Sequence, residues 1–319
     1  MNKKIAAVLA AGALAVSSLG TASVFAADLY FVTGGPMGTY HAVGYTMAEV
    51  LNPLLADSDL VLESSGASKA NLEMIEEGDA HLATVQNDVM YYAYTGTSLF
   101  EGEEPYKNFS AVAGLYDETV QIITCDDSIK SVADLAGKTV CVGDEDSGVE
   151  FNAKQILDAY GLSFDDISTV YAPFGEAASS LRTGEIDAAF IVAGAPTSAV
   201  EDLAADSSMS LVQLDDEHIK TLQGSYDFYT EAVIPAGTYE GVDEDAVTVS
   251  VRATLVASNE VSEETIYELV KALFDNKDAL AESHVKFESL NLEDAVKGMS
   301  VPFHPGAKKF YEEQGISVE

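Results

Sequence analysis

The sequence predicts an α/β protein with two lobes joined by two hinge crossings, and three observations lead to this fold class. Short β-rich segments alternate with amphipathic helical segments, which is typical of parallel α/β construction. Two such series occur, and the chain passes between them near Leu115 and again near Ile234. Paired crossings let rigid lobes close around a ligand. The expected first lobe comprises residues 27–115 and 235–319, and the second comprises residues 116–234.

The amino-terminal segment has the pattern of a secretory signal peptide. Lys3 and Lys4 precede an apolar stretch over residues 5–19, and Val24-Phe25-Ala26 meets the small-residue requirement at the −1 and −3 positions of a cleavage site. The stretch is too short to favour a membrane span. We therefore expect cleavage after Ala26, removal of residues 1–26, and a periplasmic or otherwise extracytoplasmic protein that does not insert directly into the membrane.

Composition excludes several classes of function. The chain has 53 Asp and Glu against 16 Lys and Arg, and a formal net charge of −37. Such a chain has no electrostatic source for binding the phosphates of nucleic acids. The two cysteines, Cys125 and Cys141, are too few to form a metal site without nearby histidine pairs. Their spacing permits a disulfide without establishing one. No metal and no cofactor is expected.

The elements of the expected first lobe follow from local patterns. A strand runs into a glycine-rich turn at residues 34–40, and apolar residues then recur at helical spacing. Polar turn residues mark each later change of element. The expected strands are 29–33, 60–64 and 81–85, the expected helices are 41–55 and 67–77, and a helix follows residues 86–88.

The elements of the expected second lobe repeat this rhythm. Strands alternate with helices as far as the return crossing, and a Ser-x-x-Glu cap signal at Ser262 then opens a long helix. The expected strands are 120–124, 139–142, 169–171, 188–192 and 210–214, and the expected helices are 148–160 and 176–183. After the crossing, a strand at 246–257 and the helix at 262–276 follow.

Candidate binding residues lie where strands end and helices begin. In open parallel sheets, ligands bind beyond the carboxyl ends of the strands, where the first turn of each helix presents unpaired N–H groups. Glycine permits close approach of the backbone there, and helix dipoles favour negative charge. The sequence therefore predicts one cleft between the lobes for a small organic anion. The five junctions are 34–40, 64–68, 86–88, 146–148 and 194–197.

Catalytic patterns are scarce, so no catalytic residue and no enzymatic activity is expected. The five histidines are far apart in the sequence, and no nucleophile elbow, metal-binding His-Glu motif or phosphate loop accompanies them. A secreted α/β hydrolase is the alternative from another class. A histidine within hydrogen-bond reach of Ser64 or Ser147 would favour it.

Several ordered motifs across the chain resemble those of a known family, the TAXI-type solute-binding proteins of tripartite ATP-independent periplasmic (TRAP) transporters. Together they span nearly all of the chain after residue 26, which makes them more specific than a single glycine-rich turn. The motifs are GGPMGTYHAVG (34–44), SSGASKANLEMIEEGDAHLATVQNDV (64–89), LAGKTVCVGDEDSGVE (135–150), LRTGEIDAAFIVAGAP (181–196) and PFHPGAKKFYEEQG (302–315).

The resemblance implies a periplasmic-binding-protein type II fold, the Venus-flytrap arrangement. It implies a ligand of the glutamate, glutamine or 2-oxo dicarboxylate class and a TRAP-type membrane permease, driven by an ion gradient, as partner. The ligand-binding residues that it implies are Gly35, Thr39, Tyr40, Ser64, Ser68, Gln86 and Asp88 in the first lobe, with Ser147, Gly148, Pro173, Gly194 and Pro196 in the second.

One turn departs from the family's pattern. GDEDSG at residues 143–148 places three acids beside the expected anion site, where relatives more often carry small neutral residues. If these acids, residues 144–146, line the pocket, a neutral or zwitterionic amino-acid-like ligand is favoured instead of an anion.

Overall fold

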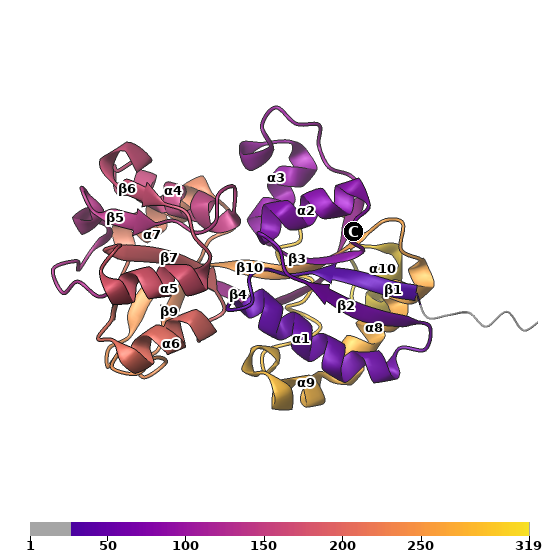
Figure 1. Cartoon of the computed structure of the whole chain (residues 1–319). Coiled ribbons are helices and arrows are strands. Elements are labelled where there is room, and N and C mark those ends of the chain that lie inside the picture. The colour runs from indigo at the N-terminus through magenta and orange to yellow at the C-terminus, as the bar shows by residue number, and fades with distance from the viewer. Residues whose placement is uncertain (1–26, 319) are drawn as a thin grey trace, which may run out of the picture.

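The computed structural model describes residues 27–318, so the predicted signal peptide lies outside the described residues. Figure 1 shows two lobes side by side, each with helices packed against strands, which confirms the predicted α/β, two-lobe architecture. The strands are β1 (Ala27–Val32), β2 (Ser58–Glu63), β3 (Leu82–Gln86), β4 (Phe109–Thr124), β5 (Thr139–Cys141), β6 (Ser168–Val170), β7 (Ala188–Ala193), β8 (Ser210–Val212), β9 (Thr230–Ile234) and β10 (Ala246–Ser258).

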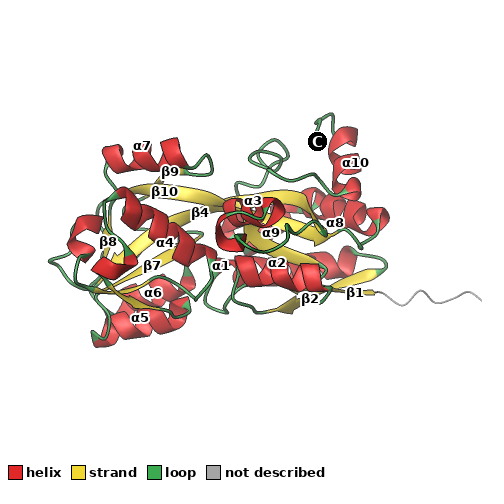
Figure 2. Cartoon of the chain, turned by 90° about the horizontal axis from the view of Figure 1, so that it is seen from above, coloured by secondary structure: helices red, strands yellow, loops and turns green. Residues whose placement is uncertain are grey.

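Helices flank the strands of both lobes, as the view from above in Figure 2 shows. The α-helices are α1 (Thr39–Leu51), α2 (Ser68–Glu77), α3 (Asn87–Thr95), α4 (Gly148–Ala159), α5 (Phe174–Thr183), α6 (Ser198–Asp206), α7 (Asp216–Ser225), α8 (Glu263–Asp275), α9 (Lys277–Ser283) and α10 (Pro305–Glu313). Short 3-10 helices are η1 (Asn52–Leu54), η2 (Ser98–Phe100), η3 (Val132–Leu135), η4 (Phe164–Asp166) and η5 (Val285–Phe287).

Two long antiparallel strands, β4 and β10, run through both lobes and connect them. The strand order is β2-β1-β3-β10-β4-β7-β5-β6, with β8 paired to β4 and β9 paired to β10. The carboxyl-terminal part of β10 pairs with β3, whereas its amino-terminal part pairs with β9. The hydrogen-bonded sheet is therefore continuous, and the hinge consists of two paired strands.

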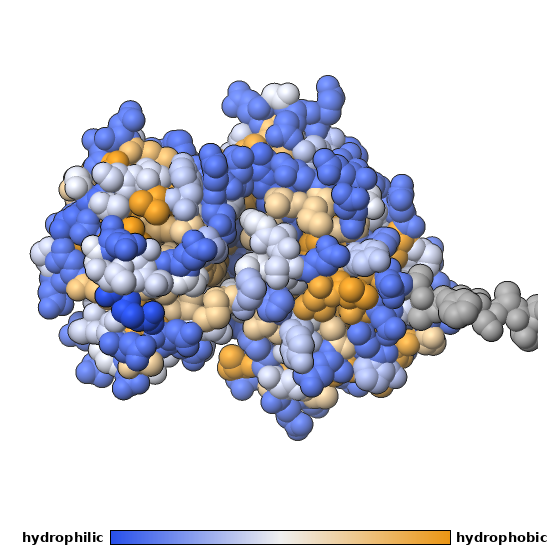
Figure 3. Space-filling view, in the orientation of Figure 1, coloured by the Kyte–Doolittle hydropathy of each residue, from blue (hydrophilic) through white to orange (hydrophobic). Residues whose placement is uncertain are grey.

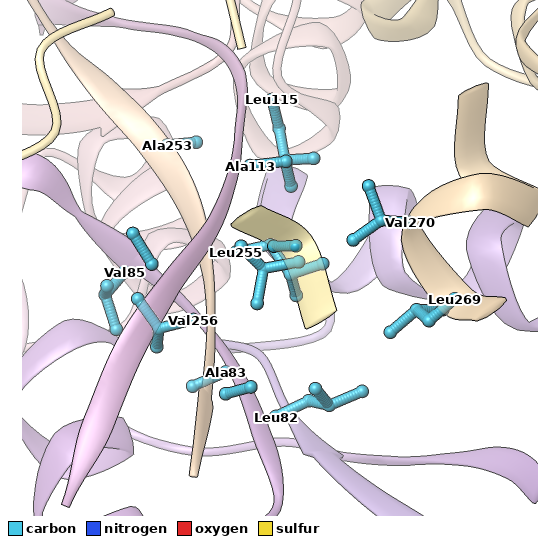
Figure 4. Packing of buried hydrophobic residues seen from close by; sticks show 14 of the residues in the cluster. Leu82, Ala83, Val85, Ala113, Leu115, Ala253, Leu255, Val256, Leu269 and Val270 are labelled. Carbon is cyan, nitrogen blue, oxygen red and sulfur yellow. The ribbon is translucent and has the colours of Figure 1, made fainter. Parts of the chain in front are cut away.

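Each lobe has its own apolar core. In the first lobe, the core cluster contains Val85, Leu255 and Val256 from neighbouring strands and Leu269 of α8 (Figure 4). The second lobe buries two clusters, one of which contains Phe190. Separate cores make each lobe a rigid body, because close-packed side chains resist deformation within a lobe more than at the strands between lobes.

The second crossing differs from its expected position near Ile234. Ile234 and Ala246 pack in a core cluster of the second lobe, and Val251 packs in the other. The reason is the β9–β10 hairpin, in which Ile234 pairs with Ala246 and so stays within the second lobe. Residues 235–251 therefore pack with the second lobe, although the sequence analysis places them in the first.

The described residues contain no helix that is both long enough and apolar enough to cross a membrane.

Cys125 and Cys141 are both free thiols in the structure, the first exposed and the second buried. On the face shown in Figure 3 a groove separates the lobes, and most of the surface of both is hydrophilic.

Candidate functional site

A cavity of about 250 Å³ lies between the two lobes, and both of them line it. Its walls contain eight of the twelve residues that the sequence analysis names for ligand binding. These eight are Gly35, Thr39, Tyr40, Ser68, Gln86, Ser147, Gly148 and Pro173. The junctions between strands and helices thus bring together residues that are more than 130 positions apart in the sequence.

Four helices begin at the cavity wall. Thr39 opens α1 and Ser68 opens α2 in the first lobe, while Gly148 opens α4 and Phe174 opens α5 in the second. The first N–H groups of a helix have no partner within the helix, so they are available to a ligand. Their dipoles favour acceptor or anionic groups of a bound molecule.

The other four predicted residues lie outside the cavity lining. Ser64 is exposed, with its Oγ 3.5 Å from His41 Nδ1. Gly194 contributes its carbonyl, which accepts a 3.0 Å hydrogen bond from the Thr39 hydroxyl across the lobes. Pro196 borders a separate hollow that also includes Tyr116. The fourth residue, Asp88, is buried in contacts between the lobes.

Asp88 connects the lobes through Asn152 on α4. The Asn152 amide donates to Asp88 Oδ2 at 3.0 Å and also to the hydroxyl of Tyr229 at 2.8 Å. Burial raises the pKa of Asp88 to about 6, and the hydrogen bond from Asn152 opposes that increase. Glu118 is a charged group near Asp88, and the charge of Asp88 contributes to the raised pKa of Glu118. The titratable side chains of Tyr92 and Tyr229 also lie near Asp88.

A second contact between the lobes adjoins Asp88. The Gln155 amide on α4 donates to the Tyr92 hydroxyl at 3.3 Å, and the Gln155 carbonyl accepts from the Tyr229 hydroxyl at 2.5 Å. Phe228 packs against Tyr92 with ring centroids 5.9 Å apart. The helices α3 and α4 therefore meet through a buried polar network, which fixes their relative orientation more specifically than apolar packing alone.

The sequence analysis does not identify Glu118, which lines the cavity from β4. Its side chain is only 2% exposed, and its Oε2 accepts a 2.7 Å hydrogen bond from the Tyr40 hydroxyl. Tyr40 Oη also lies 3.3 Å from Ser68 Oγ. Burial raises the pKa of Glu118 well above its ordinary value, and the charge of Asp88 adds to the increase. The sequence carries no distinctive signal for Glu118, because Asp117 precedes it in the same strand and the chain contains 53 Asp and Glu residues.

Gln86 lines the cavity at the end of β3 with an unsatisfied side chain. It is 2% exposed, and its Oε1 has no hydrogen-bond partner among the described residues. Its main-chain N–H donates to Ser68 Oγ at 3.0 Å. A buried carbonyl oxygen without a partner is destabilising, because its desolvation is uncompensated.

The charges on the cavity wall are all negative. Among the described lining residues, the acids are Glu118, Asp144 and Glu176, and none is Lys, Arg or His. Of the three acids in the turn at 143–148, Asp144 alone reaches the lining. Burial raises the pKa of Asp144, and the nearby charge of Glu176 raises it further.

Apolar groups complete the wall, and the sequence analysis does not identify them either. Met37 and Phe174 lie on opposite lobes, and Val149 and Val192 line the second-lobe side. Apolar residues in turns carry no distinctive sequence signal, because the same residues also fill ordinary cores. Within residues 27–318, no three His, Cys, Asp or Glu side chains are grouped to hold a metal ion.

Solved structures with a similar fold include several binding proteins. The alkanesulfonate-binding protein SsuA from Xanthomonas axonopodis pv. citri, bound to MOPS, matches with a TM-score of 0.50 and 14% identity over 91% of each chain. PhnD1 from Prochlorococcus marinus in complex with methylphosphonate matches with a TM-score of 0.54 and 12% identity over 82% of this chain and 90% of that one.

A putative L-cystine ABC transporter from Listeria monocytogenes matches with a TM-score of 0.50 and 15% identity, over 82% of this chain and 95% of that one. At these identities the likeness establishes the fold alone, which is the two-lobe periplasmic-binding-protein type II fold expected from the sequence. Sequence comparison gives the family independently, because residues 31–315 match the NMT1-like family. Since that match covers most of the chain, the protein belongs to the NMT1-like family.

Proposed function

We propose that this protein is the extracytoplasmic solute-binding subunit of a membrane transporter and that it captures a small organic molecule by closing its lobes. The cavity between the lobes carries this proposal, because both lobes contribute helix N-termini to one shared space. A ligand touching both walls stabilises the closed form, since only that form offers all contacts at once. The fold neighbours that are named as binding proteins support the same function.

The ligand class follows from the cavity wall. An organic anion, such as glutamate or a 2-oxo dicarboxylate, is supported by the four helix N-termini. A neutral or zwitterionic amino-acid-like ligand is supported by Asp144 in the lining and by the absence of a lining cation among the described residues. We favour the second class, because a dicarboxylate would bring two negative charges beside Glu118 with no guanidinium or ammonium to compensate.

The partner is a membrane permease that accepts the closed, loaded form. The motif resemblance favours a TRAP-type permease, whereas a fold neighbour named as an ABC transporter favours an ATP-driven one. Uptake into right-side-out membrane vesicles of the source cell, measured after loaded protein is added outside, distinguishes the TRAP-type permease from the ATP-driven one. Uptake that follows an imposed ion gradient without ATP supports the TRAP-type partner, and dependence on ATP hydrolysis contradicts it.

Binding without chemistry is the proposed activity, and the contact between Ser64 and His41 is the observation that could favour a hydrolase. The Oγ–Nδ1 distance of 3.5 Å is long for a nucleophile and its base, for which about 2.6–3.2 Å is usual. No described carboxylate bonds to His41, and neither residue lines the cavity. Release of p-nitrophenol from p-nitrophenyl acetate that disappears in Ser64→Ala would contradict the binding assignment.

A thermal-shift screen of residues 27–319 tests the proposed function. The panel contains amino acids, dicarboxylates, sulfonates, phosphonates and small amines. A solute at about 100 times its dissociation constant adds about 2.7 kcal/mol of stability, which is a clear shift of the melting temperature. A shift with at least one class supports solute binding, and a panel in which no solute moves the melting temperature contradicts it.

A further inference from the structure

The buried carboxyl of Glu118 has no cationic partner among residues 27–318. Its Oε2 accepts from the Tyr40 hydroxyl, and no described donor reaches its Oε1. A carboxyl that is 2% exposed ordinarily requires a paired cation or several hydrogen bonds, because its desolvation is expensive. Burial raises the pKa of Glu118 for this reason. The cavity wall therefore holds an acidic group with a single described hydrogen bond.

Three cations, Lys69, Arg252 and Lys286, contact other groups. Lys69 lies within 4 Å of three carboxylates, of which the nearest is that of Glu73 at 3.4 Å. Arg252 pairs with Asp117 at 3.0 Å. The Lys286 ammonium donates a hydrogen bond to the carbonyl of Ala195. None of these three side chains lines the cavity, so no described lysine or arginine supplies a positive charge on the wall that contains Glu118.

Gln86 provides an independent indication that the cavity wall is completed by a ligand. Its amide is 98% buried, lines the same cavity and makes no side-chain hydrogen bond with the described residues. Gln86 Oε1, which has no hydrogen-bond partner among the described residues, and the Glu118 carboxyl on the same wall both match a ligand that carries N–H groups. The remaining wall is largely apolar, with Met37 and Phe174 facing the space from opposite lobes.

We propose that Glu118 selects ligands that carry an ammonium or other cationic N–H group, so that the cargo is a small organic amine with a short apolar body. This inference rests on the proposed solute-binding function and specifies its ligand. The amine forms a charge-assisted hydrogen bond with the free oxygen of Glu118, and its carbon skeleton packs against Met37 and Phe174. Acidic groups on the same molecule, if present, meet the helix N-termini.

The test compares probes that share a carbon skeleton and differ in charge. Isopentylammonium, leucinamide and leucine carry an ammonium group, whereas 4-methylpentanoate and isopentylphosphonate carry only acidic groups. Calorimetric titration and thermal shift are measured for wild-type protein, Glu118→Gln and the control Glu77→Gln, whose side chain is exposed on α2. The affinity for leucine, compared with the affinities for the two other ammonium probes, shows whether a carboxylate on the ligand is also required.

We expect wild-type protein to bind at least one ammonium probe and Glu118→Gln to bind it at least about tenfold more weakly. Glu77→Gln is expected to bind like wild type. The unliganded Glu118→Gln variant should melt at or above the wild-type temperature, which shows that it folds.

Binding of only the acidic probes overturns this inference and leaves the solute-binding proposal intact. Equal affinity of wild type and Glu118→Gln for an ammonium probe also overturns it. If neither these probes nor the wider panel of the preceding section changes the melting temperature, the solute-binding proposal itself fails, and the inference fails with it.

Discussion

Replacing Gly148 by alanine tests how closely the lobes approach each other. Gly148 opens α4 in the second lobe, and a Cβ built there lies 1.9 Å from Gln86 Oε1 and 2.7 Å from Gln86 Cδ in the first lobe. It also lies 3.0 Å from Val89 Cγ2. Real Cβ atoms essentially never come closer than 3.0 Å to such neighbours, so the lobes must part or Gln86 must leave its place.

Inserting a methyl group into such a tightly packed contact costs about 1–3 kcal/mol, which corresponds to a loss of about 5- to 150-fold in affinity. The free-energy cost falls on the closed form alone, because the backbone φ of Gly148 lies outside the left-handed region and alanine adopts it readily. The unliganded variant should therefore unfold like wild type while calorimetric titration shows the weaker binding.

Gly224→Ala is the matched control. It adds the same methyl group within α7, where nothing lies within 4 Å of the new Cβ, and it should leave the affinity unchanged. Wild-type affinity in Gly148→Ala would refute the close approach of the lobes on which this reasoning depends.

Three further predictions concern the cavity, pH and the core. Gln86→Ala should weaken ligand binding in calorimetry without lowering the melting temperature, because Gln86 Oε1 has no hydrogen-bond partner among the described residues; unchanged affinity would remove Gln86 from the site. Asp88 has a pKa of about 6 in the folded protein against an ordinary 3.8, so the unfolded chain releases this proton first and stability falls as pH rises from about 4 to 6. This contribution is about 3 kcal/mol, and Asp88→Asn should remove it from denaturant unfolding curves; an identical pH slope in both proteins would contradict it. Leu255→Ala should destabilise the protein by about 2–5 kcal/mol in the same assay, because Leu255 is fully buried; a loss below 1 kcal/mol would contradict its place in the core.

The alternation of strands and helices could be predicted from the sequence because it follows from the local spacing of apolar and polar residues. The expected helix at 148–160 and the observed α4 differ by one residue, and the cap signal at Ser262 corresponds to a side chain that accepts from the Thr265 N–H. The second crossing could not be predicted in the same way. It depends on the pairing of β9 with β10, and such pairing is a tertiary interaction that local patterns do not specify.

The candidate site shows the same division. Junctions rich in glycine and serine carry a local signal, and eight of the residues named there or from the resemblance line the cavity. Glu118 carries none, because the chain contains 53 acids and only the packing around β4 distinguishes this one by burial. Asp88 is the opposite case, because it is named as a ligand-binding residue from the sequence but does not line the cavity. Its side chain contacts Asn152 between the lobes instead.

The central claim, that ligand binding closes the lobes, is tested most directly by a distance measured between them. Spin labels at Glu77→Cys and Glu185→Cys, both exposed and on different lobes, are introduced with Cys125→Ser so that the exposed native thiol is not labelled. The account predicts that saturating ligand shifts the distance distribution measured by pulsed electron resonance to one narrower, shorter population. The same distribution with and without bound ligand would contradict it.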